Sequence, residues 1–237
     1  MNKKLGIWIT GASSGIGKAL SIEFAKIGFK VFASSRNNVD LERINQELEK
    51  DKCEVEIIPC NVASFSNVDN SFKKILAKTK LGCLVNNAGI TTFKLAEENS
   101  IREIDDIIST NLLGSIYTIK TVLPHFIQNG GGTIINVLSV VAKQVYTKSS
   151  AYSASKAGLL AYTNSLREEV RKYNIRVINV LPGATETQMW PKKIREEFSS
   201  KMMSASDVAR AIVWAYLQEG NSVVEELVIK PITGDLK

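Results

Sequence analysis

The sequence predicts one α/β domain, in which a parallel sheet of about seven strands carries helices on both faces. Short apolar runs alternate with amphipathic helical stretches along the whole chain, an order typical of strand–helix–strand units. A glycine-rich turn follows the first apolar run directly and leads into a helix. The 237 residues are 44% hydrophobic, which suffices for one sizeable core, and no linker or repeat divides residues 1–237. We therefore expect a single doubly wound domain.

The composition argues against several classes of partner. Lys and Arg number 30 against 24 Asp and Glu, a net charge of +6, but the basic residues are mixed with acidic ones and form no stripe, so we expect no nucleic-acid partner. His125 is the single histidine and the three cysteines are widely spaced, so we expect neither a metal site nor a disulfide framework. No apolar run reaches membrane-spanning length, and the start reads as a strand rather than a signal peptide, so we expect a cytoplasmic protein without membrane partners.

The first predicted strand, residues 5–10, ends at a turn that contains Gly11, Gly15 and Gly17. Residues 18–27 continue with helical periodicity, and Gly28 is placed to end that helix. Glycines let backbone approach a pyrophosphate, and a helix N-terminus offers free N–H groups and the positive end of its dipole. The spacing differs from the common Gly-x-Gly-x-x-Gly, but its place between strand and helix favours a dinucleotide site over an ordinary turn.

The second predicted strand, residues 30–35, ends without the acidic residue that usually holds the ribose 2′-hydroxyl of NAD. Arg36 stands there instead, and its planar, always-charged guanidinium can pair with the 2′-phosphate of NADP. Ser34, Ser35 and Asn37 surround it with hydroxyls and an amide. An ordinary surface arginine is the alternative, and the position about twenty residues after the glycine turn favours the phosphate.

The remaining elements follow the same alternation of short apolar runs and longer amphipathic stretches. Helices are expected over residues 39–50, 66–79, 97–126 in two pieces, 152–173 and 204–217. Strands are expected over residues 54–59, 81–86, 133–138, 175–181 and 226–230. The last helix begins at Ser204 with capping-box spacing to Asp207, and the polar segment 187–203 before it has room for one short charged helix.

Ligand-binding residues are expected where these strands end, because open α/β sheets bind ligands at the carboxyl ends of their strands. Asn87 follows one strand, Ser139 another, and Pro182 a third. The sequence predicts that they lie together with the glycine turn along one edge of the sheet. Trp190, in the polar segment, fits substrate contact and plain packing equally well.

Tyr152 and Lys156 lie four residues apart in a helical pattern, so they share one face of the helix. An ammonium beside a phenol favours the phenolate and lowers the tyrosine pKa. A tyrosine tuned in this way can transfer a proton near neutral pH. The same pair is common on solvated helix faces, so its meaning depends on the other groups at the sheet edge.

Taken together, these residues resemble the short-chain dehydrogenase/reductase family. The resemblance runs almost from end to end and rests on six motifs in the family's order and spacing. They are Thr10-Gly11-x-x-x-Gly15-x-Gly17, Asn86-Asn87-Ala88-Gly89, Asn111 in Asn-Leu-Leu-Gly, Ser139, Tyr152-x-x-x-Lys156 and Pro182-Gly183-x-x-x-Thr187. The resemblance implies a Rossmann-type fold and a homotetramer or homodimer.

It also implies a catalytic tetrad of Asn111, Ser139, Tyr152 and Lys156. In that arrangement Tyr152 exchanges a proton with the carbonyl oxygen, and Ser139 donates a hydrogen bond to the same oxygen. Lys156 lowers the tyrosine pKa and binds the nicotinamide ribose, and Asn111 holds a water behind it.

The cofactor-binding residues implied by the resemblance come from six segments. They are Gly11, Ser13, Ser14, Gly15, Ile16 and Gly17 at the pyrophosphate; Arg36; Asn61 and Val62 at the adenine; Asn87, Ala88, Gly89 and Ile90 at the ribose; Tyr152 and Lys156; and Pro182, Gly183, Thr185 and Thr187 at the nicotinamide. Two positions depart from the family pattern. Asn61 replaces the usual Asp, and Ser14 stands where many NADP-binding members have a basic residue, so the preference for NADP(H) over NAD(H) depends on Arg36.

The sequence therefore predicts an NADP-dependent oxidoreductase that interconverts a carbonyl and a secondary alcohol. Length and pattern are similar to 3-oxoacyl-carrier-protein reductases, which makes an acyl thioester one candidate substrate. Residues 225–231 replace the Asn-Gly-Gly ending usual in those enzymes, so a small ketone, aldehyde or sugar is an equal candidate. The alternative from another class is a catalytically silent, NADP(H)-binding regulatory protein, whose mark would be a broken tetrad.

Overall fold

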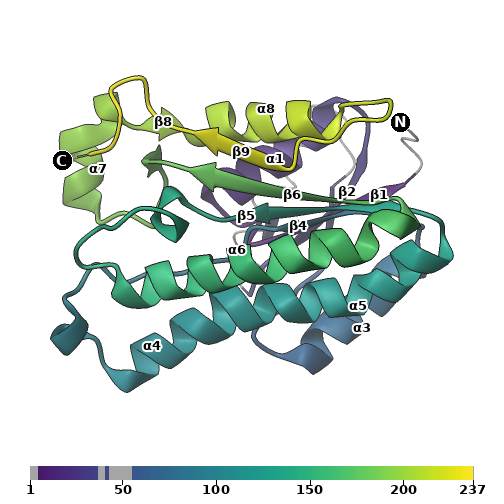
Figure 1. Ribbon diagram of the computed structural model, residues 1–237, viewed down its shortest axis with the longest axis horizontal. Coiled ribbons are helices and arrows are strands. Elements are labelled where there is room, and N and C mark those ends of the chain that lie inside the picture. The colour runs from purple at the N-terminus through teal and green to yellow at the C-terminus, as the bar shows by residue number, and fades with distance from the viewer. Residues whose placement is uncertain (1–4, 37–40, 43–54, 237) are drawn as a thin grey trace.

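The computed structural model describes residues 5–36, 41–42 and 55–236 of the chain (Figure 1). Seven strands form one sheet in the order β3-β2-β1-β4-β5-β6-β9, and every neighbouring pair is parallel. The strands are β1 (Gly6–Thr10), β2 (Lys30–Ser34), β3 (Val55–Ile57), β4 (Leu81–Asn86), β5 (Gly132–Val137), β6 (Ile175–Pro182) and β9 (Glu226–Ile229). The predicted fold class is confirmed.

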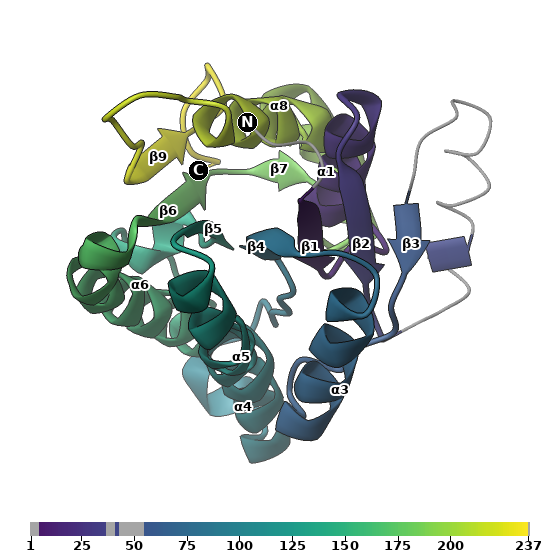
Figure 2. The ribbon, with the colours of Figure 1, turned by 90° about the vertical axis from the view of Figure 1, so that its right-hand side faces the viewer.

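Helices cover both faces of this sheet (Figure 2). One face carries α1 (Gly15–Lys26) and α8 (Ala205–Tyr216), which pack against each other. The other carries α3 (Phe65–Leu76), α5 (Gly114–Gln128) and α6 (Ser150–Val170), with α4 (Ile101–Ile108) preceding α5. No helix in the described part of the chain is long and apolar enough to cross a membrane.

The strands are almost entirely apolar because both of their faces are buried. Side chains of β1 alternate between two cores: Ile7 and Ile9 belong to the core under α1 and α8, and Trp8 belongs to the core under α3 and α5. Trp8 stacks on Phe72 of α3 with ring centroids 6.2 Å apart. Burial of these side chains on both faces fixes the height at which each strand ends.

A row of buried asparagines crosses the centre of the sheet. Asn86, Asn136 and Asn179 occupy paired register positions on β4, β5 and β6. The Asn86 amide donates to Asn136 Oδ1 (3.0 Å), and the Asn136 amide donates to Asn179 Oδ1 (3.1 Å). Thr118 of α5 donates to Asn86 Oδ1 (2.6 Å), and Asn179 donates to Asn164 of α6 (3.1 Å). This asparagine row therefore ties three strands to both flanking helices.

Most predicted elements agree with the structure to within a few residues, and two regions contain features that the pattern did not predict. The run expected as two helical pieces is continuous through a π-helix, η2 (Ser109–Leu113), between α4 and α5. The polar segment contains α7 (Lys192–Phe198), and its two ends are joined by β7 (Thr185–Glu186) and β8 (Met203–Ser204). The helix expected over residues 39–50 falls largely outside the described residues, as do Asn37 and Cys53.

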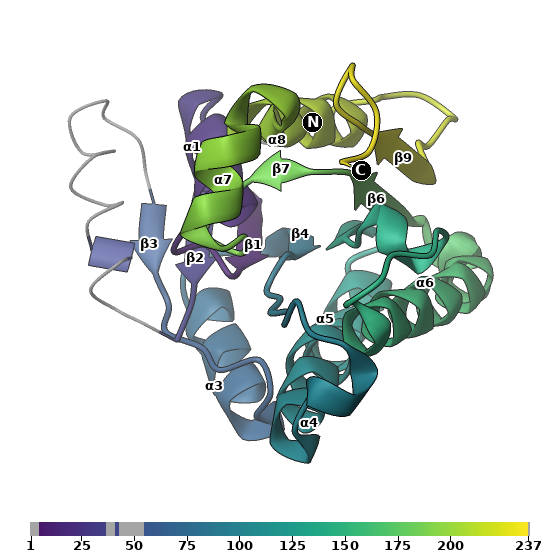
Figure 3. The same ribbon diagram turned by 90° about the vertical axis from the view of Figure 1, so that its left-hand side faces the viewer.

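The capping box predicted before the last helix is present. Ser204 accepts from the Asp207 amide (3.1 Å), and the Asp207 carboxylate accepts from the Ser204 amide (3.0 Å). These bonds satisfy N–H groups that a helix start leaves without partners. They begin α8 directly after β8. Because β8 pairs with β7, the segment 187–202, which contains α7, begins and ends at the same place (Figure 3).

Candidate active site

The carboxyl edge of the sheet opens into a cavity of about 790 Å³. That volume lies within the range of cofactor and substrate pockets, roughly 300–1,000 Å³. The predicted residues that line it are Gly11, Ser13, Ser14, Gly15, Ile16, Arg36, Asn61, Val62, Asn87, Ala88, Gly89, Ile90, Ser139, Tyr152, Lys156, Pro182, Gly183, Thr185 and Thr187. Gly17 and Asn111 do not line it. The glycine turn, Asn87, Ser139 and Pro182 thus meet at one cavity, as the strand ends predicted.

The glycine turn is held in shape from behind by the start of the segment after β4. The Thr10 hydroxyl accepts from the amides of Asn87 (3.1 Å) and Ala88 (3.2 Å). In return, the Asn87 side chain donates to the carbonyls of Thr10 and Gly11, both at 3.0 Å. Thr10 had no role of its own in the sequence-based predictions. It is buried, and its hydrogen bonds hold this turn against the segment after β4.

All three glycines of the turn have a reason to be glycine: Gly11 and Gly15 have positive φ, and Gly17 has no room for a Cβ. Gly11 adopts φ +65°, and a Cβ there would lie 2.6 Å from Ala88 Cα. At Gly17 a Cβ would lie 2.3 Å from the Gly11 carbonyl oxygen, so Gly17 serves close packing of α1 on the turn. Gly17 does not line the cavity, and its expected contact with the cofactor stays a prediction. At the N-terminus of α1 the side chain of the N-cap residue Ser14 makes no capping hydrogen bond, and no acidic residue occupies the first turn, so the site can receive an anion.

The side chains at the end of β2 point in different directions: Ser35 and Arg36 line the cavity, and Ser34 is buried in the core. Arg36 is exposed and lines the cavity, and within the described residues no acidic side chain pairs with it. Ser35 lines the cavity beside it. Ser34 is buried instead: its hydroxyl donates to the Ile58 carbonyl (2.6 Å) and accepts from the Trp8 indole (2.8 Å). The expectation that Ser34 surrounds the arginine head is therefore wrong, because the strand turns that side chain into the core.

Asn61 and Val62 line the same end of the cavity. Asn61 is exposed, and its Oδ1 accepts from the Ala63 amide (3.2 Å) in a tight local turn. That bond leaves one lone pair of the amide oxygen for a ligand. Val62 is buried against Gly114, where a Cβ would lie 2.8 Å from Val62 Cγ2, so the start of α5 packs directly on this wall.

Tyr152 stands in the first turn of α6, and Ser139 directly follows β5, so the two side chains meet across the cavity. Burial raises the pKa of the Tyr152 phenol to about 12, and its hydrogen bond with Ser139 works in the opposite direction. The phenol is therefore protonated at neutral pH, the form that can donate a proton.

Lys156 is 3% exposed, and its Nζ donates to the Val137 carbonyl at 2.8 Å. Burial lowers the pKa of this ammonium to about 8. Its Nζ lies 5.8 Å from the centre of the Tyr152 ring. The expected lowering of the tyrosine pKa is therefore wrong for the protein by itself, because desolvation of the phenol outweighs the nearby ammonium.

Asn111 is fully buried in η2 and connects the cavity wall to α6. Its Oδ1 accepts from the Ile90 amide (2.8 Å), and its Nδ2 donates to the Ile90 carbonyl (2.9 Å) and to Ser155 Oγ (3.0 Å). Ser155 in turn donates to the Tyr152 carbonyl (2.7 Å). With both amide hydrogens used, the Asn111 side chain positions neighbouring backbone, and the water expected behind Lys156 stays a prediction.

The far end of the cavity contains residues to which sequence reasoning gave no role, because they lie on loops without a motif. Phe93 and Trp190 stack with ring centroids 4.8 Å apart and an interplanar angle of 16°. Tyr146, Asp235 and Leu236 complete this end. Only Trp190 carried a signal, as an aromatic residue in a polar segment. Among the described residues no three His, Cys, Asp or Glu side chains are grouped to hold a metal ion.

Comparison with known proteins gives a consistent result. A family model described as short chain dehydrogenase matches residues 6–197. A sepiapterin reductase of Chlorobaculum tepidum is 32% identical over 237 aligned positions, which cover 97% of each chain.

Two solved structures are similar over nearly the whole chain. An alcohol dehydrogenase of the archaeon Thermococcus sibiricus, complexed with 5-hydroxy-NADP, has a TM-score of 0.88 and 26% identity, covering 98% of this chain and 99% of that one. A metagenomic short-chain oxidoreductase in complex with NADP has a TM-score of 0.85 and 26% identity, covering 96% and 97%.

Proposed function

The chain belongs to the short-chain dehydrogenase family of oxidoreductases, and on this premise we propose that it transfers a hydride between NADP(H) and a carbonyl or secondary-alcohol substrate. The observation that carries the proposal is one cavity that contains both a helix N-terminus free for an anion and the Tyr152–Ser139 pair. A hydride donor and a proton donor have to meet at one carbon–oxygen bond, and this cavity holds a place for each.

The residues present fit a dinucleotide with a 2′-phosphate. Gly11 and Gly15, at φ +65° and +53°, keep the approach to the start of α1 free of side chains. A Cβ at Gly89 would lie 3.5 Å from Lys156 Nζ, so Gly89 likewise keeps the space beside the lysine free of a side chain. Arg36 supplies the cation for the phosphate. The NADP ligands of the two similar structures support the same choice.

In this proposal the bound cofactor supplies or accepts the hydride. Tyr152 donates its phenolic proton to the carbonyl oxygen of the substrate, and the raised pKa keeps that proton in place at neutral pH. Ser139 accepts from the Val141 amide (3.3 Å), which leaves its O–H to donate to the same substrate oxygen. Lys156 places an ammonium beside the phenol and binds the cofactor's ribose hydroxyls. Asn111 fixes the backbone of Ile90 and, through Ser155, that of Tyr152.

For the substrate, we propose a compact ketone or aldehyde with an apolar or aromatic body. The stacked Phe93 and Trp190 rings offer such a body a flat wall. The relative named sepiapterin reductase supports including sepiapterin in any substrate panel. A 3-oxoacyl thioester is the second candidate, on the chain's overall similarity to enzymes that reduce such thioesters.

The decisive experiment follows NADPH oxidation with a panel of ketones, aldehydes, sepiapterin and acetoacetyl thioesters, in the wild type and in Tyr152→Phe. Turnover should fall roughly 10²–10⁴-fold in the variant, the scale of general acid catalysis, while NADPH still binds. Tyr162→Phe, on the same helix but outside the cavity lining, is the matched control and should keep full turnover. Near-normal turnover in Tyr152→Phe would remove this tyrosine from the mechanism. NADPH binding without turnover of any carbonyl would favour the silent regulatory protein.

The proposal extends to assembly, for which we expect a homotetramer or homodimer. Ile101 on α4 and Leu113 on η2 expose apolar side chains, to 75% and 36%, on the helical layer around α6. Light scattering coupled to size-exclusion chromatography measures the mass, and a monomer at micromolar concentration would contradict this part. A cytoplasmic location stays a prediction.

A further inference from the structure

The last strand delivers the C-terminal end of the chain to the cavity. Ile229 of β9 pairs with Pro182 of β6, and the Gly183 amide donates to the Ile229 carbonyl at 2.8 Å. The next two residues pack on the loop that follows β6, since Lys230 Cγ and Pro231 Cδ both lie 3.3 Å from the place of a Cβ on Gly183. Pro231 is buried. The chain therefore leaves the sheet directly beside the predicted nicotinamide wall.

A tight turn then sends the chain back on itself. The Gly234 amide donates to the Pro231 carbonyl (2.9 Å), and Gly234 adopts φ +82°, which favours glycine. Ile232, at the tip, is fully exposed. The turn returns Asp235 to Lys230, with Lys230 Nζ 2.8 Å from Asp235 Oδ2, and it directs Asp235 and Leu236 to the cavity lining.

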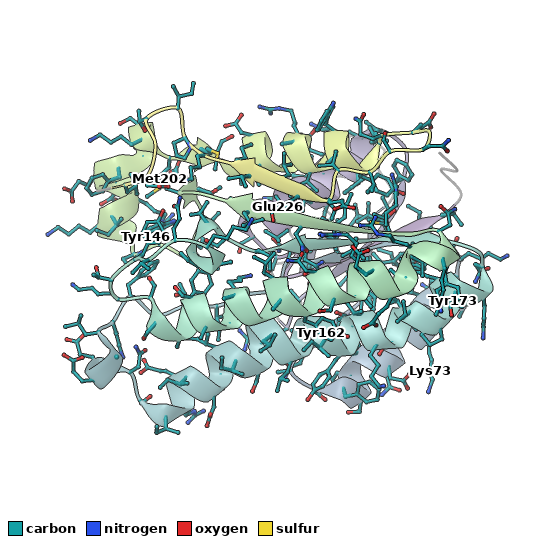
Figure 4. All side chains as sticks on the ribbon, in the orientation of Figure 1. Lys73, Tyr146, Tyr162, Tyr173, Met202 and Glu226 are labelled. Carbon is teal, nitrogen blue, oxygen red and sulfur yellow. The ribbon has the colours of Figure 1, made fainter. Side chains whose placement is uncertain are left out.

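A cluster of four side chains, which we call the tail latch, fastens this turn to the body of the protein. It consists of Gln144, Tyr146, Lys230 and Asp235. Lys230 Nζ donates to Gln144 Oε1 at 3.0 Å, and the Tyr146 hydroxyl lies 2.9 Å from the same oxygen. Tyr146 also hydrogen-bonds the Asp235 carboxylate. Figure 4 shows Tyr146 on the side of the molecule where Figure 1 labels α7, far from Lys73 on α3.

The latch residues come from two distant parts of the sequence that meet at the substrate end of the cavity. Gln144 and Tyr146 precede α6, only a few residues before Tyr152, and Lys230 and Asp235 follow β9. Lys230 and Asp235 have only 27% and 26% of their side chains exposed, so solvent screens this ion pair less than a pair at the open surface. Leu236 adds the one apolar side chain of the tail that reaches the cavity.

We propose that residues 231–236 form a substrate-selecting wall, which the tail latch holds closed over the far end of the cavity and which excludes long carbonyl substrates. The inference rests on the proposed carbonyl chemistry and adds the part of the chain that sets substrate length. With the latch closed, a substrate lies between this wall and the Phe93–Trp190 stack. With the latch broken, the wall swings out and the cavity lengthens. The glycine turn and Arg36 lie in other segments, and both variants of the test keep Lys230 and Pro231, which pack on Gly183, so we expect cofactor binding to change little.

The test uses Asp235→Ala and a chain truncated after Ile232, with methyl ketones from three to ten carbons as the probe and NADPH as reductant. Losing the latch should raise the ratio of kcat/KM for the longest ketone to that for the shortest by about fivefold, the factor that ~1 kcal/mol makes. The dissociation constant of NADPH should stay within twofold of the wild type. The matched control is Asp69→Ala, which removes a carboxylate paired with Lys73 at 2.7 Å on α3.

An unchanged length ratio in both variants would overturn the proposal. If none of the proteins reduces any ketone, that result refutes the proposed reaction and not the wall. The wall is then judged by binding of the same ketones to the NADPH complexes, followed by tryptophan fluorescence. Tighter binding of the long ketones to Asp235→Ala than to the wild type supports the wall, and equal binding refutes it.

Discussion

Lys156 places a positive charge where burial opposes it. The side chain is 3% exposed, its ammonium donates to the Val137 carbonyl, and desolvation lowers the pKa of the ammonium from 10.5 to about 8. A shift of that size corresponds to about 3 kcal/mol of folding stability given up while the lysine is charged in both states. The proposed reaction gives a reason to keep it, because in that proposal the ammonium binds ribose hydroxyls of the cofactor beside Tyr152.

This cost predicts an unusual pH dependence for Lys156→Met. Between pH 8 and 10.5 the unfolded chain binds more protons than the folded one, so the wild type gains stability as pH rises through this window. Methionine has no such dependence. The difference in unfolding free energy, variant minus wild type, should therefore fall by about 3 kcal/mol from pH 7 to pH 10.5. Urea unfolding at a series of pH values measures it.

Lys73→Met is the control for that series, because Lys73 is an exposed lysine and its replacement should leave the pH dependence unchanged. The raised pKa of Tyr152 acts above pH 10 in all three proteins, so it cancels in the differences. A difference that stays constant from pH 7 to 10.5 would show that the Lys156 ammonium is not desolvated.

At the scale of elements, the asparagine row explains how three separate strands present their ends at one height. Asn86, Asn136 and Asn179 are almost fully buried and bond only sideways along the row and to the flanking helices. The residues that follow these strands in the chain include Asn87 and Ser139, and Lys156 bonds the carbonyl of Val137, next to Asn136. A slip of one strand would move these groups out of the cavity.

Replacing the middle member tests this reading. Asn136→Leu fills the space but leaves the Asn86 amide and Asn179 Oδ1 unpaired, so unfolding free energy should fall by about 2–5 kcal/mol. Replacing Asn86, Asn136 and Asn179 together by apolar residues should cost clearly less than the sum of the three single changes, because no amide within the row is then left unpaired and only Thr118 and Asn164 lose a partner. Strict additivity in chemical denaturation would mean that the row does not act as a unit.

The elements also show what sequence patterns can and cannot provide. All seven strands of the main sheet were predictable from short, mostly apolar runs. The inner five are largely buried, and the edge strands β3 and β9 are only partly buried. The two-residue strands β7 and β8 were not, because so short a pairing has no periodicity of its own. The π-helix η2 was not, because one extra residue per turn hardly disturbs a helical pattern. Asn86 was quoted for its motif, but its row depends on register between strands, which a single chain does not reveal.

For the molecule as a whole, the cavity is assembled from segments that range from Gly11 to Leu236. Motif residues account for the cofactor side, because backbone geometry demands glycine there and the chemistry demands Tyr152 and Ser139. The proposed substrate side comes from Phe93, Trp190 and the tail, and of these the sequence marked only Trp190, because the other positions depend on loop packing. The oxidoreductase class was therefore predictable from the sequence, and the proposed wall was not.

The whole-molecule prediction concerns how strongly each cofactor stabilises the fold. Arg36 lines the cavity, no acidic side chain in the described residues pairs with it, and no acid ends β2. A charge-assisted hydrogen bond contributes roughly 1.5–3 kcal/mol, which is about ten- to a hundredfold in affinity. We therefore expect NADPH to bind at least tenfold more tightly than NADH.

Linkage turns that ratio into a measurable shift in the melting temperature. At a concentration one hundred times the dissociation constant of NADPH, NADPH stabilises the folded state by about 2.7 kcal/mol. A tenfold weaker NADH at the same concentration contributes about 1.4 kcal/mol. Since each kcal/mol raises the melting temperature by about 2–4 °C for a chain of this size, NADPH should give roughly twice the shift of NADH.

The double variant Ser35→Asp, Arg36→Ala should reverse the order, because it adds an acceptor for the 2′-hydroxyl and repels the 2′-phosphate. Equal shifts with both cofactors in the wild type would reduce Arg36 to a surface residue, and the phosphate would then need another partner at this edge of the sheet.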